Sequence, residues 1–326
     1  MTTLSYRDAV RRALDEELAR DENVIFFGED VGRSGGVFKV TPGLFEKFGP
    51  DRVRDTPISE TAIVGAGIGA AITGLRPIVE LMFADFAAVA YDQIINQAAK
   101  MRYMSGGQIK VPLTIRMAQG GGMSFGAQHS QCCEAWFMAV SGLKVVVPST
   151  PADALGLLKT AIRDDNPVVF LEHKALYADY GEVPDAEHLV PFGQANILRA
   201  GHHVTIVAVQ RMLRMALKAA ESLAAEGIEC EVIDLRTLVP LDLETVLTSL
   251  RKTNRLITVE ESPLAGGWGG LLTSRILDEA IWYLDAPVVR VTMGESMVPF
   301  SPPLEAALIP NEQHIIAAVH RLGIKP

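Results

Sequence analysis

The sequence predicts an α/β protein of two domains, each built on a largely parallel sheet covered by helices. Short apolar runs of strand length alternate with amphipathic runs of helix length along most of the chain, which is typical of parallel sheets with helical connections. The chain has 326 residues, 48% of them hydrophobic and 21% charged, enough for about two ordinary cores. The alternation fades after residue 175 and then resumes. We therefore expect a first domain over residues 1–180, a linker over 181–198 and a second domain over 199–326.

The charge and the cysteines exclude several classes of protein. A formal net charge of -9 argues against sequence-independent nucleic-acid binding, which needs lysine and arginine to neutralise phosphates. The 7 histidines are scattered and the sequence contains no C-x-x-C pair, so we expect no zinc site. Three cysteines, two of them the adjacent Cys132 and Cys133, form no disulfide framework and favour a reducing compartment. No apolar run reaches membrane-spanning length and no signal peptide opens the chain, so we expect a cytoplasmic protein or a mature organellar one.

The first domain should open with a helix over Ser5–Arg20, which carries an approximate capping box of Ser5 and Asp8. A short buried strand over Val24–Phe27 follows. Apolar runs predict the remaining strands over 77–82, 111–117, 143–147 and 167–171, and helical patterns predict helices from about residue 60, over 87–104 and over 151–163.

Glu60 stands at the mouth of a glycine-rich apolar helix. Pro57 disfavours a helical conformation at Thr56, and Ser59 is a suitable N-cap, so the helix should begin at about Glu60. No charge follows before Arg76, a composition that suits a helix buried on most sides. A carboxylate in the first turn of such a helix is partly desolvated and favoured by the helix dipole. Glu60 is therefore either a capping residue or a tuned acid-base group.

The same helix contains a partial dinucleotide-binding fingerprint. Gly65, Gly67 and Ala70 fit the G-x-G-x-x-G/A pattern, and Asp85 lies at a suitable distance for a ribose-binding acid. That fingerprint requires an apolar strand running directly into the glycines, whereas residues 51–60 are polar and interrupted by proline. A nicotinamide site is thus disfavoured.

Polar or aromatic residues follow three of the predicted strands. Glu29 and Asp30 come directly after the strand at 24–27, and Phe86 lies just beyond the strand at 77–82. Open α/β sheets bind ligands at the carboxyl ends of their strands, so these positions are candidates, although acids in such loops are also ordinary turn residues. His129 lies in a loop between Gln119-Gly-Gly-Gly122 and the next helix, where it is either a reactive group or an exposed histidine.

The second domain repeats the α/β pattern without an internal repeat of solenoid period. We expect strands over 204–209, 230–234, 255–259 and 288–291, helices over 212–226, 243–250, 270–284 and 311–322, and a proline-rich crossing over 299–303.

Taken together, these positions make the chain similar to a known family. It resembles the β subunit of the thiamine-diphosphate-dependent decarboxylating component of 2-oxoacid dehydrogenase complexes. The resemblance implies a pyrimidine-binding domain, a parallel sheet with helices on both faces, followed by a transketolase C-terminal-like domain. It covers nearly the whole chain and rests on six strings in the family's order: Gly28-Glu-Asp-Val31, Thr56-Pro-Ile-Ser-Glu60, Gly74-Leu-Arg-Pro77, Gln128-His-Ser-Gln131, Ala161-Ile-Arg-Asp-Asp-Asn-Pro167 and Glu231-Val-Ile-Asp-Leu-Arg-Thr237.

The resemblance implies roles for individual residues. Glu60 matches the glutamate that hydrogen-bonds the N1′ nitrogen of the aminopyrimidine and so activates the cofactor. Phe86 matches the aromatic residue that stacks on the aminopyrimidine, and Glu29 and Ile58 fall where the family lines the cofactor pocket. His129 matches an active-site histidine on the substrate side that is implicated in acyl transfer to the lipoyl arm.

The resemblance also implies metals and partners. A structural potassium site would use mainly backbone oxygens, plus the side chain of Asn166, from Leu113, Ala161, Ile162, Asp164 and Asn166. Oxygen ligands suit such a hard cation, although the same composition fits a plain turn. No Gly-Asp-Gly motif for holding the diphosphate through magnesium occurs in the sequence. We therefore expect an α subunit to hold the magnesium in an α2β2 heterotetramer, and the C-terminal domain to dock the subunit-binding domain of a lipoyl acyltransferase core.

The family resemblance leaves more than one substrate open. Pyruvate is the first choice, and branched-chain 2-oxoacids and acetoin are the alternatives within the family. A nicotinamide-dependent enzyme and a non-catalytic assembly subunit are the alternatives outside it. Two segments depart from the family pattern, namely Val209-Gln-Arg-Met212, where Tyr-Gly-x-Met is usual, and Thr292-Met-Gly-Glu-Ser296. We expect neither segment to touch the site.

Overall fold

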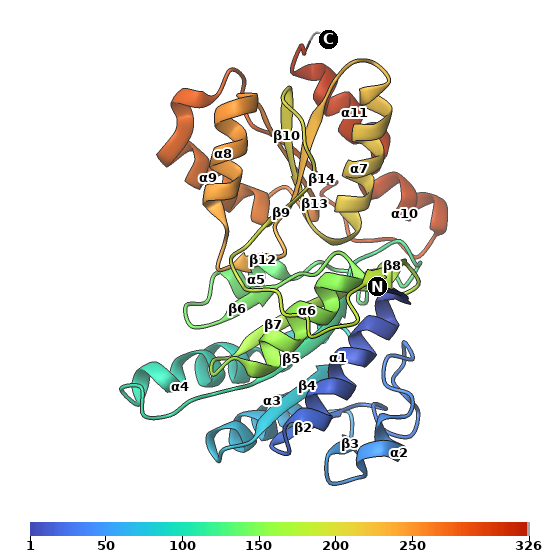
Figure 1. Cartoon of the computed structure of the whole chain (residues 1–326), viewed down its shortest axis with the longest axis vertical. Helices are drawn as coiled ribbons and strands as arrows, with labels where there is room; N and C mark the ends of the chain where they lie inside the picture. The colour runs from blue at the N-terminus through green and yellow to red at the C-terminus, as the bar shows by residue number, and fades with distance from the viewer. Residues whose placement is uncertain (325–326) are drawn as a thin grey trace. The chain divides into compact units, whose positions relative to one another are not determined.

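The computed structural model describes residues 1–324, which form two compact units (Figure 1). Unit 1 contains Met1–Gln119 and Trp136–Phe192, and unit 2 contains Gly120–Ala135 and the chain from Gly193 onward. The predicted boundaries were continuous in sequence, whereas unit 2 takes in an excursion of sixteen residues from the first half of the chain. That excursion carries His129. Within the described residues, no helix combines the length and the apolarity needed to cross a membrane.

The sheet of unit 1 is parallel, and its strands run in the order β6-β7-β5-β4-β2-β3. In chain order the strands are β2 (Val24–Gly28), β3 (Val53–Asp55), β4 (Arg76–Leu81), β5 (Thr114–Gln119), β6 (Lys144–Val146) and β7 (Val168–His173). Gly28 is in register with both Asp55 and Glu80. The carboxyl ends of β3, β2 and β4 therefore meet at one edge, and the loops that follow them start side by side.

Helices cover both faces of this sheet, as predicted. On one face α1 (Tyr6–Arg20) packs against α6 (Pro151–Arg163), and their apolar side chains share a core with Phe26 and Phe170. On the other face α3 (Glu60–Ile72) packs on β4, and Gly67 lies directly against Val79. The predicted cap of α1 is confirmed, because the Ser5 hydroxyl accepts the backbone N–H of Asp8 at 3.1 Å.

The helix predicted over residues 87–104 is wrong as a single element. The chain instead forms a 3-10 turn η1 (Ala84–Ala88), a π-helical stretch η2 (Gln93–Ala98) and α4 (Ala99–Met104). A π turn moves the following side chains round the helix axis, yet it buries a similar set of apolar residues, here Ile94 and Ala98. Apolar periodicity alone does not distinguish it from an α-helix.

The two ends of the predicted linker are β-structure. Strand β8 (Tyr180–Val183) pairs antiparallel with β1 (Thr2–Ser5), and β9 (Asn196–Arg199) joins the sheet of unit 2. The Met1 ammonium adds an ion pair with Asp185 at 2.5 Å. These strands are largely exposed and have little apolar alternation, and their partners lie far away in sequence. Periodicity therefore missed them.

Unit 2 is built on a sheet of order β14-β13-β10-β11-β9, in which only β9 runs antiparallel among the described strands. Its other strands are β10 (Val204–Ala208), β11 (Cys230–Asp234), β13 (Leu256–Pro263) and β14 (Val289–Met293), and a short strand β12 spans Thr237–Val239. The helices are α7 (Gln210–Ala224), α8 (Leu243–Thr253), α9 (Trp268–Ala280), α10 (Pro302–Leu308) and α11 (Glu312–Arg321), with a 3-10 turn η4 (Ile281–Tyr283).

Helices α7 and α11 share one face of this sheet, and α8 and α9 lie together on the other (Figure 1). The proline-rich crossing is a correction, because Pro302 and Pro303 open the helix α10. Proline is tolerated in the first turn of a helix, where its missing N–H would have no helical partner. This helix contacts the loop that carries His129.

Candidate functional site

The carboxyl edge of the unit 1 sheet brings together the cofactor residues expected from the sequence. Glu29 follows β2, the segment that leads to Glu60 follows β3, and Phe86 follows β4. Because these three strands are neighbours in parallel register, their loops start from one edge. Two further short helices are α2 (Leu44–Phe48) and α5 (Glu134–Met138).

Glu60 begins α3 as predicted, and its side chain is buried, with the residue only 7% exposed. Ser59 occupies the N-cap position, but its side chain makes no capping hydrogen bond, which corrects the expected cap. The Ser59 carbonyl accepts the N–H of Ile63 at 2.9 Å, which is the first backbone hydrogen bond of the helix. A buried carboxylate at the positive end of a helix is well placed to take or hold a proton of a bound ligand.

Glu29 supplies a second buried carboxylate beside this edge. Its Oε1 atom has no hydrogen-bond partner among the described residues. Burial, and secondarily the negative charges of Glu60 and Asp30, raise the pKa of Glu29. A buried polar atom without a partner is costly, so this position suits a ligand that brings its own hydrogen-bonding groups.

Phe86 gives the site a half-buried aromatic face. Its ring meets that of Phe83 edge to face, with centroids 5.5 Å apart, and Phe83 meets Phe38 in the same way at 5.6 Å. Ile58, on the loop entering α3, is 82% exposed. An aromatic face, an uncovered aliphatic side chain and two buried carboxylates together suit a planar ring that carries hydrogen-bonding nitrogens. The residues present therefore fit the aminopyrimidine half of thiamine diphosphate.

A buried ionic network lies within the same sheet. Arg116 on β5 pairs with Glu80 on β4 and, through two nitrogens, with Glu172 on β7. Burial opposes the charge on Arg116, but the two carboxylates outweigh it and raise the pKa of the guanidinium. Burial likewise raises the pKa of Glu80 despite the nearby arginine. This network was not predicted from the sequence, although charged residues inside two of the predicted apolar strands were the available signal.

The expected potassium ligands gather where α6 ends and β7 begins. The carbonyl oxygens of Ile162 and Asp164 accept hydrogen bonds from Arg76 at 2.9 and 2.8 Å. Those of Leu113 and Ala161 accept backbone N–H groups at 2.9 and 3.2 Å. Each carbonyl has a second lone pair, and the carboxyl end of a helix favours cations, so the backbone set fits a hard cation.

The side chain of Asn166 departs from this expectation. Its Oδ1 atom accepts a hydrogen bond from Arg102 at 2.6 Å, and its amide nitrogen donates to Asp164 at 2.8 Å. The carboxylate of Asp164 also pairs with Lys144. The side-chain oxygen expected to bind potassium is thus directed at a guanidinium, and the potassium site stays a prediction.

His129 lies in unit 2, on the loop Gly120–Ala135, and is partly buried. Its backbone N–H donates to the carbonyl of Gly126 at 3.4 Å, which closes a turn. The N–H of Gly120 donates to the carbonyl of Gln131 at 3.1 Å and joins the two ends of the loop.

The first departure from the family pattern contacts the loop that carries His129, at Gly122. Gln210 has φ 52, so it occupies the left-handed region at the position where the resemblance has glycine. The next residue, Arg211, lies against Gly122, where an added Cβ would meet the guanidinium carbon at 2.9 Å. Arg211 also pairs with Glu261 at 3.6 Å.

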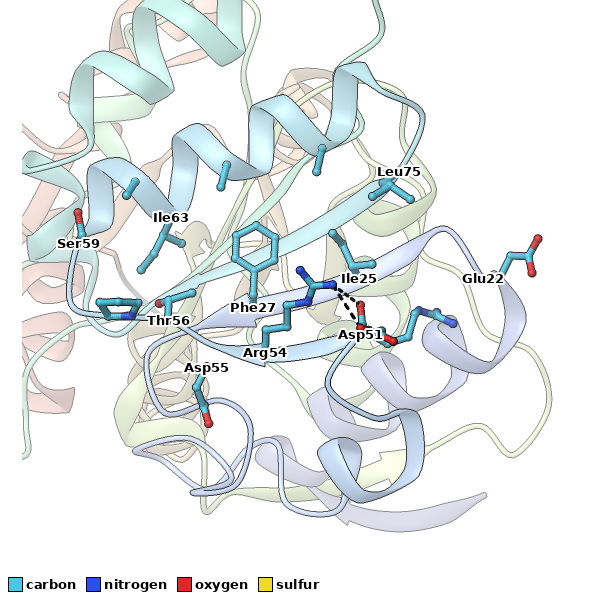
Figure 2. Close-up of a pocket in the computed structure, with 15 residues that line it drawn as sticks. Glu22, Ile25, Phe27, Asp51, Arg54, Asp55, Thr56, Ser59, Ile63 and Leu75 are labelled. Atoms are coloured by element: carbon cyan, nitrogen blue, oxygen red, sulfur yellow. Dashed lines mark hydrogen bonds and ion pairs between the residues drawn. The ribbon is translucent and has the colours of Figure 1, made fainter.

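A separate pocket of about 620 Å³ opens between α3 and strands β2 and β3 (Figure 2). Its apolar walls include Ile25, Phe27, Ala62, Ile63, Ala66, Ala70 and Leu75. At its rim Arg54 donates to the carbonyl of Asp51 at 3.2 Å. Glu60 does not line it, so this pocket is distinct from the carboxylate site.

The structure also bears on the nicotinamide alternative. Residues 56–59 separate the short strand β3 from α3, so no strand runs directly into the glycines. Gly67 faces the sheet, where a Cβ would lie 2.8 Å from Val79, and the helix begins with the carboxylate of Glu60. A negative charge at that end disfavours a bound diphosphate.

Two family models together match most of the chain. The family described as "Transketolase, pyrimidine binding domain" matches residues 2–179, and "Transketolase, C-terminal domain" matches residues 193–315. The chain is similar to "Pyruvate dehydrogenase E1 component subunit beta, mitochondrial" of Dictyostelium discoideum, with 48% identity over 98% of this chain and 91% of that protein. It is equally similar to "Acetoin:2,6-dichlorophenolindophenol oxidoreductase subunit beta" of Cupriavidus necator, with 48% identity over 98% of this chain and 97% of that protein.

Among solved structures, "Split gene transketolase, inactive beta4 tetramer" has a TM-score of 0.81, with 27% identity over 99% of each chain. The two family matches confirm the predicted order of a pyrimidine-binding domain and a transketolase C-terminal domain, and the structural likeness agrees with the predicted fold. With both domains matched, and with identity at this level over nearly the full length, the chain belongs to the family of pyruvate dehydrogenase E1 component β subunits.

Proposed function

We propose that this chain is the β subunit of a thiamine-diphosphate-dependent enzyme that decarboxylates a 2-oxoacid and transfers the acyl group to a lipoyl arm. The observation that carries the proposal is the pair of buried carboxylates, Glu60 at the start of α3 and Glu29 with an unpartnered Oε1 atom. When bound, thiamine diphosphate supplies the electron sink that decarboxylation needs.

The residues of this chain would then bind and orient the aminopyrimidine. Glu60 would hold a proton at the N1′ nitrogen, since it is a buried acid at a helix start. Phe86 would stack on the ring, and Glu29 would accept or share a hydrogen bond at its free oxygen. Ile58 would help to exclude water once a partner covers it, because 82% of the residue is exposed. His129 would act on the substrate side, during acyl transfer.

The diphosphate half of the site would come from a partner. The sequence contains no Gly-Asp-Gly motif, and magnesium needs such oxygen ligands to anchor phosphates. An α subunit would supply them in an α2β2 heterotetramer, and the relatives' names as β subunits support this arrangement. The C-terminal domain would dock the subunit-binding domain of a lipoyl acyltransferase core. We place the complex in the cytoplasm or inside an organelle.

Calorimetric titration of thiamine diphosphate and magnesium tests the half-site. We expect heat of binding when the chain is mixed with an α subunit and none when either subunit is alone. Tight binding to the chain alone would refute the shared site. Full decarboxylation by the α subunit alone would instead favour a non-catalytic assembly role for this chain.

Pyruvate is the proposed substrate, and acetoin is the second candidate because the acetoin-oxidising relative has the same identity of 48%. Steady-state rates of the reconstituted enzyme with pyruvate, branched-chain 2-oxoacids and acetoin distinguish them. We expect the highest kcat/KM with pyruvate. A higher value with acetoin would reassign the chain to the second activity.

We also propose that potassium binds at the end of α6, through the backbone oxygens of Ile162 and Asp164 among others. A resident ion would stabilise the folded chain by mass action, so Tm should rise more in KCl than in NaCl at equal ionic strength. Equal melting curves in both salts would remove potassium from the proposal.

A further inference from the structure

Two buried carboxylates from the second half of the chain hold the loop that carries His129. All the contacts involved lie within unit 2. The loop passes repeatedly through the left-handed region, at Gly120 (φ 85), Gly122 (φ 87) and Gly126 (φ 77), and also at a non-glycine residue, Ser124 (φ 58). A non-glycine residue in this conformation costs on the order of 1 kcal/mol and persists only where its surroundings hold it.

Glu305 on α10 provides most of that support. Its Oε1 atom accepts the backbone N–H of Gly122 at 2.8 Å, and its Oε2 atom accepts that of Ser124 at 2.9 Å. The Ser124 hydroxyl lies 3.3 Å from the same Oε2 atom. Glu305 is only 3% exposed, and hydrogen bonds to a buried carboxylate are about twice as strong as neutral ones.

Glu261, near the end of β13, holds the preceding residue. Its Oε1 atom accepts the N–H of Gly121 at 2.6 Å, and Arg211 lies beside its other oxygen. There is no room for side chains here, because a Cβ on Gly121 would lie 2.6 Å from Ile309. The consecutive glycines are therefore required for the close approach of the backbone to both carboxylates.

The support extends toward the histidine. The ring of Phe300 lies 3.7 Å from the position of a Cβ on Gly126, and the Gly126 carbonyl closes the turn with His129. The chain from the Glu305 anchor to His129 is only five residues long, measured from Ser124. Its conformation is thus fixed at both ends.

We propose that Glu305, assisted by Glu261, is a positioning residue that holds His129 in the geometry needed for acyl transfer to the lipoyl arm. This inference rests on the proposed function, since the role of His129 belongs to that proposal. A purely structural role for Glu305 would affect both half-reactions alike. A positioning role would affect the step that uses His129 and spare the decarboxylation that uses Glu60.

The test is Glu305→Gln in the reconstituted holoenzyme with its α subunit. Glutamine keeps the size of the side chain but loses the charge, and one of its two terminal atoms donates where the loop also donates. We expect amide exchange of residues 121–131 to become about tenfold faster or more, given the strength of bonds to a charged acceptor. We expect lipoyl-dependent turnover to fall about tenfold, while dye-coupled decarboxylation stays within about twofold.

Glu279→Gln is the matched control, because Glu279 is an exposed acid on α9 whose carboxylate pairs with Arg275 on the surface. It should change neither readout. If Glu305→Gln fails to fold, Phe300→Ala replaces it, because Phe300 is 74% exposed and its loss leaves the core intact. That variant should speed exchange at residues 126–129. It should also lower lipoyl-dependent turnover more than dye-coupled decarboxylation.

Unchanged exchange of the loop, or an equal fall of both activities, would overturn the proposal. Absence of decarboxylation by the unmodified complex would instead refute the proposed function. Because exchange is measured without turnover, the anchoring of the loop is tested in either case.

Discussion

Arg116 and Glu172 form a buried two-point contact between the neighbouring strands β5 and β7, with Nη2 and Oε2 2.9 Å apart. Arg116 is 2% exposed and Glu172 fully buried, and Glu80 on β4 contacts the same guanidinium. Such a network specifies strand register, because a slip of one residue would leave a charge buried without a partner.

Removing the arginine from this network should be severe. Arg116→Met leaves two buried carboxylates uncompensated, so we expect the free energy of unfolding to fall by about 3–5 kcal/mol, measured by urea denaturation. Arg275→Met removes a half-exposed arginine from a surface pair with Glu279 and should change stability by less than about 0.5 kcal/mol. Equal effects of the two substitutions would mean that the network is unimportant for stability.

Glu60→Gln should abolish catalysis and keep the fold. The amide preserves the size of the side chain at the start of α3 but cannot exchange a proton, so decarboxylation should fall by about 10²–10⁴-fold. Turnover by the reconstituted enzyme measures the loss, and circular dichroism checks the fold. Glu46→Gln, on the exposed surface of α2, is the control and should retain full activity. Near-normal decarboxylation by Glu60→Gln would contradict the assignment.

Glu29 predicts a dependence of stability on pH. Burial raises its folded pKa above the ordinary value of 4.5, so the folded chain holds this proton more tightly than the unfolded chain. The stabilisation is complete below pH 4.5 and is lost as pH rises through the folded pKa. Glu29→Gln removes the charge, so relative to the unmodified chain its Tm should increase between acidic and neutral pH.

Melting curves of both proteins across this range check the prediction. Glu46→Gln serves again as the control, and its difference in Tm should stay flat. A difference for Glu29→Gln that is independent of pH would mean that the carboxylate titrates alike in the folded and unfolded chains.

Two glycines of α3 provide a matched pair. A Cβ on Gly67 would lie 2.8 Å from Val79 and 2.9 Å from Leu113, so Gly67→Ala should destabilise the fold by about 1–3 kcal/mol through overpacking. A Cβ on Gly69 would meet open space, and alanine favours the helix over glycine by about 1 kcal/mol. Gly69→Ala should therefore stabilise the fold. Urea denaturation measures both, and destabilisation by Gly69→Ala would contradict the packing described.

Local pattern determined much of the architecture. The alternation of strand and helix predicted a parallel sheet covered on both faces, and the starts of α1, α3 and α6 were predicted at Tyr6, Glu60 and Pro151 to within one residue. The placement of Glu29 and Phe86 followed as well, because parallel strands bring their carboxyl ends to one edge. The family resemblance was confirmed over nearly the whole chain.

Tertiary structure alone decided the features that join distant segments. The pairing of β1 with β8, the buried contact between Arg116 and Glu172, and the anchoring of the His129 loop by Glu305 each join residues far apart in sequence. Periodicity reports which face of an element is buried, because that depends on neighbours within a few residues. It does not report which distant backbone group or charge becomes the partner, since that choice is made only when the complete chain packs and leaves no buried polar group uncompensated.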